Sequence, residues 1–95
     1  MWKIGTKVIV RTYSAGVHFG TLTSLDGKVV TLTNARRIWR WFGANTLNEI
    51  ANHGVDTDRS KISEPVPAIL LTEAIEVIPC SEKSVASLEN ATWTS

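Results

Sequence analysis

Residues 34–54 read NARRIWRWFGANTLNEIANHG, and the interpretation of the whole chain starts from this stretch. Its first part alternates arginine with large apolar residues, which predicts an extended strand. Successive side chains of a strand point to opposite faces, so each face would carry both arginine and large apolar groups. Two interpretations remain open. The strand is an edge or interface strand whose rings pack while its arginines reach water, or it is a binding surface for a planar anion.

Gly43 ends this strand, and a short helix is expected to follow. Thr46 is a suitable N-cap with Glu49 three residues later, as in a capping box. Gly54 fits the left-handed position that ends many helices. Away from its apolar stripe the helix would carry carboxamides, which donate and accept hydrogen bonds and so suit base edges and ribose hydroxyls. A solvated helix face is the alternative. These carboxamides are Asn45, Asn48 and Asn52.

The composition predicts one ordered domain with a small core. The chain has 95 residues, of which 43% are hydrophobic and 20% are charged. Cys80 is the single cysteine, which excludes an internal disulfide and fits a reducing compartment. The sequence contains no signal-peptide pattern and no apolar run of the roughly twenty residues that a membrane span needs. We therefore expect a cytoplasmic protein with no membrane partner.

The net charge of +1 conceals an uneven distribution along the chain. Residues 1–40 contain seven lysines or arginines and one acidic residue, whereas residues 41–95 contain three and eight. This division favours contact between unlike halves of two subunits, or an anion site in the first half. Duplex DNA usually requires a broader basic surface, so no duplex nucleic acid is expected as a partner.

The residues around the central stretch predict a small antiparallel β structure. A Ser-Ala-Gly turn and an Asp-Gly hairpin signal separate three segments rich in β-branched residues. A polar loop, a last apolar strand and a final helix capped by Ser81 are expected after the amide-rich helix. The three early strands are expected at residues 7–12, 17–25 and 28–33, the loop at 55–67, the last strand at 68–78, and the end of the final helix near residue 90.

The fold class predicted from these elements is α+β. It consists of a small curled antiparallel β-sheet or open barrel with two short helices. Residues 1–95 would form a single nucleotide-binding domain, with residues 83–95 as its C-terminal helix and tail.

The chemistry suggested by the sequence is non-covalent binding. Two histidines and one cysteine have no metal-ligand spacing, and the sequence shows no lysine-containing phosphate loop, dinucleotide fingerprint or nucleophile elbow. Neither catalysis nor a cofactor or metal is expected. Two groups of residues are candidate pockets for an anionic, ring-bearing ligand. The first is Phe42 with Asn45, Asn48, Asn52 and Arg59; the second is Arg11, the turn residues Ser14, Ala15, Gly16 and His18, and Arg36 with Arg37.

Three blocks of the sequence resemble a known family. They are VIVRTYSAGVHFGTL at residues 8–22, NARRIWRWFGANTL at residues 34–47, and KISEPV followed by ILLTEAIEVIPCSE up to residue 82. Together they are similar to the phage Thoeris anti-defence sponges of the type first described as capturing cyclic ADP-ribose isomers. The resemblance covers residues 5 to about 83, although no single block is a catalytic signature.

The resemblance implies a phage protein that acts in the cytoplasm of the infected bacterial host. It would sequester the cyclic ADP-ribose isomer made by bacterial TIR enzymes without cleaving it, so that the downstream effector stays inactive. It also implies a homo-oligomer, a dimer or a hexamer, and in some members a separate site for cyclic di- or trinucleotides.

Two functions of other classes remain as alternatives. The basic first half and the tryptophan-bearing strand are compatible with a small nucleic-acid-binding barrel, although the acidic second half argues against it. The same strand is also compatible with a subunit interface in a structural or assembly protein of a phage particle.

Overall fold

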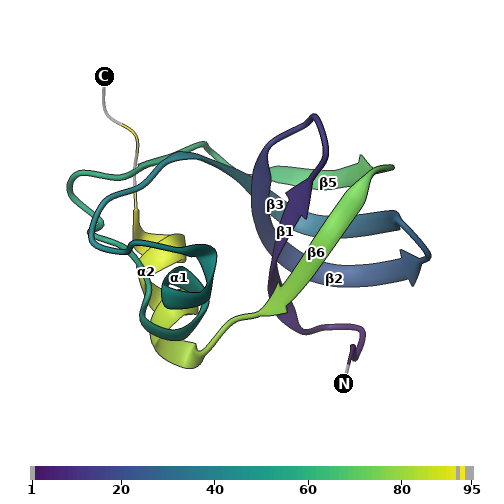
Figure 1. Cartoon of the computed structure of the whole chain (residues 1–95), viewed down its shortest axis with the longest axis horizontal. Helices are drawn as coiled ribbons and strands as arrows, with labels where there is room; N and C mark the ends of the chain where they lie inside the picture. Colours follow the sequence, from purple (N-terminus) through teal and green to yellow (C-terminus); the bar gives the residue numbers. More distant parts are fainter. Residues whose placement is uncertain (1, 92, 94–95) are drawn as a thin grey trace.

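The computed structural model describes residues 2–91 and 93, and it forms one sheet with two helices packed beside it (Figure 1). The strands follow the order β4-β3-β2-β1-β6 in an antiparallel sheet that is not closed, and β5 also pairs with β3. This architecture confirms the predicted α+β class. In chain order the elements are β1 (Lys7–Thr12), β2 (Val17–Asp26), β3 (Val29–Arg40), α1 (Leu47–His53), β4 (Lys61–Ile62), β5 (Val66–Leu71), β6 (Ala74–Pro79) and α2 (Glu82–Asn90).

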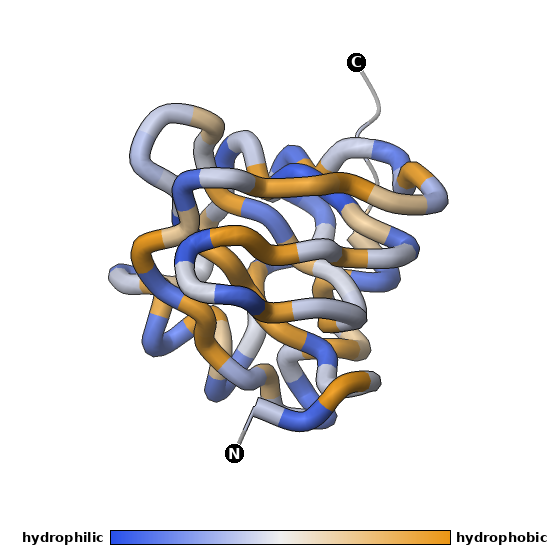
Figure 2. Tube along the Cα trace, turned by 90° about the vertical axis from the view of Figure 1, so that its right-hand side faces the viewer, coloured by the Kyte–Doolittle hydropathy of each residue, from blue (hydrophilic) through white to orange (hydrophobic). Residues whose placement is uncertain are grey.

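The hydrophobic core consists of two clusters on opposite faces of the sheet. β1 contributes to both, because Val8 and Val10 belong to the first cluster and Ile9 to the second. The first cluster fills the curl of the sheet. The second packs the sheet against residues of both helices, including Ile50 and Leu88. Figure 2 shows the apolar stretches recurring on neighbouring strands. Neither helix of the described chain has the length and apolar character needed to span a membrane.

β3 is one long strand, where the sequence predicted two. Its halves are joined at a bulge, in which Asn34 adopts a left-handed φ of 49° and, with Ala35, lies opposite Gly20. A Cβ on Gly20 would lie 3.1 Å from the Leu32 Cβ, so the glycine permits this close approach. The first half of β3 pairs with β5 and the second half with β4, which is how one strand serves both parts of the sheet.

The sequence predicted one continuous strand at residues 68–78, and this prediction is wrong because the structure has two strands there. The structure places a bend at Thr72 and Glu73 between β5, which pairs with β3, and β6, which pairs with β1. The bend is held by neighbouring backbone, since the Tyr13 N–H donates to the Glu73 carbonyl at 2.9 Å and the Ala74 N–H to the Lys28 carbonyl at 3.0 Å. The predicted loop at residues 55–67 is also interrupted, by β4.

Both predicted helices are present with the expected caps. Thr46 Oγ1 accepts from the Glu49 N–H, and Gly54 ends α1 with a φ of 86°. Ser81 caps α2 in the same way. One detail differs from a standard capping box, because the Glu49 carboxylate accepts from the backbone N–H of Asn45 at 3.3 Å instead of from the cap residue.

Candidate ligand-binding site

Unpaired cations and aromatic rings gather where β3 ends beside β4. Arg40 of β3 pairs with Lys61 of β4 in the sheet, which brings the segment around residue 59 next to the end of β3. The guanidinium carbons of Arg59 and Arg40 lie 4.3 Å and 5.2 Å from the centre of the Phe42 ring. The ion pairs within the described residues are Lys7–Glu89 and Arg11–Glu76, so none of these three cations is neutralised by a carboxylate.

A hollow of about 500 Å³ lies between the β1–β2 turn and the end of β3. We call it the turn hollow. It forms because Val17 pairs with Ile38, which places the turn beside the residues that follow Ile38 on β3. Its lining therefore combines residues of the turn with an arginine and two tryptophans. The lining residues are Ser14, Ala15, Gly16, Val17, Arg37, Ile38, Trp39 and Trp41.

Arg37 is shared between the turn hollow and a smaller cavity of about 120 Å³ on its other side. Its backbone is held by Ser63, whose Oγ accepts from the Arg37 N–H at 2.7 Å and whose N–H donates to the Arg37 carbonyl at 2.9 Å. Among the described residues, no hydrogen bond or ion pair engages the Arg37 guanidinium. This guanidinium is thus anchored at its base and available at its head. The smaller cavity is lined by His18, Ala35, Arg36, Arg37, Ser63, Glu64, Val66 and Ile69.

His18 lies directly across the sheet from Arg37 and is only 1% exposed. Its Nε2 is 3.0 Å from the Ala15 carbonyl, which can only accept, so Nε2 carries the proton. Burial lowers the pKa of His18; the hydrogen bond to Ala15 partly opposes this shift, and the positive charge of Arg37 adds a smaller lowering effect. The ring is therefore neutral at pH 7, with Nδ1 as an acceptor.

The turn itself is rigid because its polar groups are already engaged. The Ala15 N–H donates to Thr12 Oγ1 at 2.9 Å, and Ser14 Oγ donates to the Glu73 carboxylate at 2.7 Å. The Ala15 amide is consequently occupied and is not free to donate to a phosphate. Arg11 does not line the turn hollow; its Nε donates to Glu76 at 2.6 Å.

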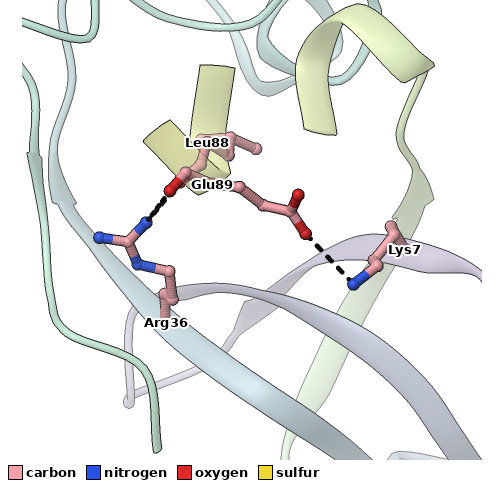
Figure 3. A network of polar contacts seen from close by, with 4 residues as sticks. All are labelled: Lys7, Arg36, Leu88 and Glu89. Carbon is pink, nitrogen blue, oxygen red and sulfur yellow. Dashed lines mark hydrogen bonds and ion pairs between the residues drawn. The ribbon is translucent and has the colours of Figure 1, made fainter. Parts of the chain in front are cut away.

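Arg36 is directed into the interior, unlike its neighbour Arg37. It is 9% exposed, and its guanidinium donates to backbone carbonyls at the end of α2 and beside β4. Figure 3 shows the bond to Leu88 and, on the same helix end, the Lys7–Glu89 ion pair. Burial lowers the pKa of Arg36, and Glu89 opposes the shift. The structure gives this residue a structural role where the sequence suggested an anion contact. The accepting carbonyls are those of Ile62, Ser63, Leu88, Glu89 and Ala91.

The first predicted pocket is only partly assembled. Phe42 and Arg59 do meet, but they meet each other, with the Arg59 guanidinium lying over the Phe42 ring. The Asn45 side chain donates to Glu49 at 3.3 Å. Asn48 and Asn52 face a different hollow, of about 300 Å³, whose other walls are Ala51, Glu76, Ile78 and Pro79.

Other chemistry finds little support in the geometry. Within residues 2–91 and 93, no group of three or more potential metal ligands is gathered. Burial raises the pKa of the Cys80 thiol to about 11, so this cysteine is protonated and a poor nucleophile at pH 7. The arrangement at the turn hollow is instead suited to holding an anion beside an aromatic ring.

Comparison with known protein families assigns the chain to one family. A family described as a domain of unknown function, DUF6948, matches residues 5–88. The chain belongs to the DUF6948 family. Neither the curated proteins nor the solved structures gave a match. The DUF6948 match contains the turn hollow and every strand, and it ends within α2. Trp39 and Trp41 were predicted on a strand interpreted as an interface or as a surface for a planar anion, but they were not included in either candidate pocket. Ser63 was not singled out, and its position follows from β3–β4 pairing.

Proposed function

We propose that this DUF6948 protein binds and sequesters a small nucleotide signal of the cyclic ADP-ribose isomer class, made by bacterial TIR enzymes, without cleaving it. The turn hollow carries the proposal, because its lining combines Arg37, whose guanidinium has no partner among the described residues, with Trp39 and Trp41. The biological setting is that of a phage sponge in the cytoplasm of the infected host, as the sequence resemblance implies. Cyclic di- or trinucleotides are proposed as ligands of a second site.

The dimensions and chemistry of the hollow support a ligand of this kind. Its volume of about 500 Å³ lies within the range of small-molecule sites. A guanidinium binds phosphate oxygens in a bidentate manner, and Arg37 has its head available. Stacking of a base on an aromatic ring contributes roughly 1–3 kcal/mol. The charges of Arg40, Arg59 and Lys61, which form no ion pair with the described carboxylates, raise the positive potential nearby and favour encounter with an anion.

Sequestration also requires tight binding, which is favoured when the site is ordered in advance. The turn is fixed by Thr12 and by the bond between Ser14 and Glu73. The base of Arg37 is fixed by two bonds to Ser63. Trp41 packs against the second core cluster. Ligand binding would therefore order little more than the Arg37 head.

Calorimetric titration with a cyclic ADP-ribose isomer tests the position of the site. Arg37→Ala and Trp41→Ala should each lower the affinity at least tenfold, because each removes a wall of the turn hollow. Lys28→Ala, which removes one positive charge outside the hollow, is the matched charge control and should bind like the parent. Loss of binding in Phe42→Ala and Arg59→Ala, with Arg37→Ala unaffected, would place the site at the Phe42 ring instead.

A second measurement separates binding from turnover and from nucleic-acid recognition. After incubation, heat denaturation should release the cyclic ADP-ribose isomer chemically unchanged, as judged by mass spectrometry. Linear ADP-ribose that increases with time would make the protein an enzyme. A parent protein that ignores the cyclic nucleotide but binds a single-stranded oligonucleotide would favour the nucleic-acid-binding alternative.

A further inference from the structure

Trp93, five residues beyond the DUF6948 match, stacks on Trp39 of the turn hollow. The two ring centres are 5.1 Å apart and the ring planes differ by 21°. Lys61 lies on β4, and its Nζ is 5.5 Å from the centre of the Trp93 ring. Lys61 of β4, Trp93 and Trp39 of β3 are thus in successive contact, although all three lie far apart in the sequence.

Arg36 anchors the chain at Ala91, two residues before Trp93. Its guanidinium donates to the Leu88 carbonyl at 2.7 Å and to the Ala91 carbonyl at 2.6 Å, and Ala91 is fully buried. Figure 3 shows Arg36 reaching the end of α2. Two residues span at most about 7 Å, so a fixed Ala91 confines Trp93 to the neighbourhood of β3 and β4.

The stack leaves one side of Trp39 for a ligand. The rings are in direct stacking contact, so no base fits between them. Trp39 lines the turn hollow, whereas Trp93 does not. Trp93 therefore supports Trp39 from outside the hollow. Trp39 remains 57% exposed, and without this support its ring would be free to turn on a strand that ends nearby.

We infer that Trp93 is a positioning residue that holds the Trp39 ring in place to stack on the base of the bound nucleotide. This inference rests on the proposed function and adds the C-terminal segment to the site. An indole ring held in place by a second ring is suited to bind a planar aromatic base, because an ordered ring loses less entropy when the base stacks on it.

Calorimetry with the cyclic ADP-ribose isomer tests the inference through a double-mutant cycle. Trp93→Ala should weaken the affinity three- to tenfold, and Trp93→Phe should restore it to within about twofold of the parent. In a Trp39→Ala background, Trp93→Ala should have no further effect, because Trp93 acts only through Trp39. Trp2→Ala, which removes another exposed tryptophan, is the matched control and should bind like the parent.

The outcomes separate this inference from the proposed function. If the parent binds and Trp93→Ala binds equally well or more tightly, the inference is wrong while the proposed function stands. Additive effects of Trp39→Ala and Trp93→Ala would also overturn it. If the parent does not bind, both proposals fall. The midpoint of thermal unfolding should be the same for Trp93→Phe and the parent, which keeps the binding comparison valid.

Discussion

Two adjacent arginines of β3 have opposite roles because strand geometry sends them to opposite faces. Arg37 lines the turn hollow, and its guanidinium has no partner within residues 2–91 and 93, whereas Arg36 turns toward α2. The last carbonyls of a helix lack partners within the helix. Arg36 supplies donors to those of Leu88 and Glu89 and to the Ala91 carbonyl that follows. A single side chain thereby joins the sheet, the end of α2 and the C-terminal segment.

Arg36→Ala should lower the free energy of unfolding by roughly 2–4 kcal/mol, since each buried carbonyl left without a donor costs about 1–3 kcal/mol. Urea denaturation would measure the change. Arg36→Lys should recover only part of the loss, because an ammonium donates from one point and cannot span the same carbonyls. Unchanged stability together with lost cyclic-dinucleotide binding would instead support the sequence-based assignment of Arg36 as a ligand residue.

His18 makes stability depend on pH. Burial lowers its pKa below the ordinary value of 6.5, so near pH 6 the unfolded chain binds more protons than the folded chain. The stabilisation that His18 contributes is complete above pH 6.5 and is lost as the pH falls from there toward the lowered pKa. The slope is at most about 1.4 kcal/mol per pH unit for one proton. Urea denaturation at pH 7.5 and pH 5.5 should show the decrease, and His18→Gln should remove most of it.

At the scale of elements, the sequence predicted what local chemistry encodes. Both helices were predicted from their cap residues Thr46, Gly54 and Ser81, because caps are local signals. The bend between β5 and β6 escaped prediction, because Thr72 and Glu73 carry no turn signal and the bend is held by Tyr13 and Lys28, which are distant in the sequence. The joining of two predicted strands into β3 depends likewise on a bulge opposite Gly20.

The candidate site was predictable to a similar extent. The sequence grouped Ser14, Ala15 and Gly16 with Arg37, and the structure does bring them together around the turn hollow. It also placed Arg36 there, because adjacency alone does not reveal which of two arginines meets a helix end. The stacking of Trp93 on Trp39 follows the anchoring of Ala91 by Arg36, and no local sequence pattern contains this contact.

Gly54 ends α1 at a point where the chain packs closely against α2, so it should not tolerate a side chain. Its φ is 86°, and a Cβ there would lie 2.1 Å from Ser87 Oγ of α2. Backbone strain costs an L-residue about 1–2 kcal/mol and overpacking about 1–3 kcal/mol, so Gly54→Ala should lower the free energy of unfolding by roughly 2–5 kcal/mol. Gly16 has the same φ of 86° with nothing within 4 Å of its would-be Cβ, so Gly16→Ala should show the strain alone. If urea denaturation showed equal decreases in the free energy of unfolding for the two variants, the predicted clash with Ser87 would be wrong.

At the scale of the whole molecule, large apolar side chains remain on the surface of a single chain. Among the described residues, several of these side chains lie on β5, on β6 and at the end of β3. A domain of this size buries a limited fraction of its surface, and association is a common way to bury more. The exposed residues are Trp2, Ile4, Tyr13, Leu25, Val29, Trp39, Val66, Leu70, Ile75 and Trp93.

The protein should therefore be at least a dimer at micromolar concentration, and light scattering would measure its mass. Two forces are available to hold the subunits together: burial of this apolar surface, and attraction between the basic first half and the acidic second half of the chain. They respond differently to salt, because 1 M salt shortens the screening length to about 3 Å but does not weaken apolar burial. We expect the oligomer to persist in 1 M sodium chloride. Dissociation there would assign the interface to the charged halves, and the mass of a single chain at low salt would contradict the prediction of an oligomer.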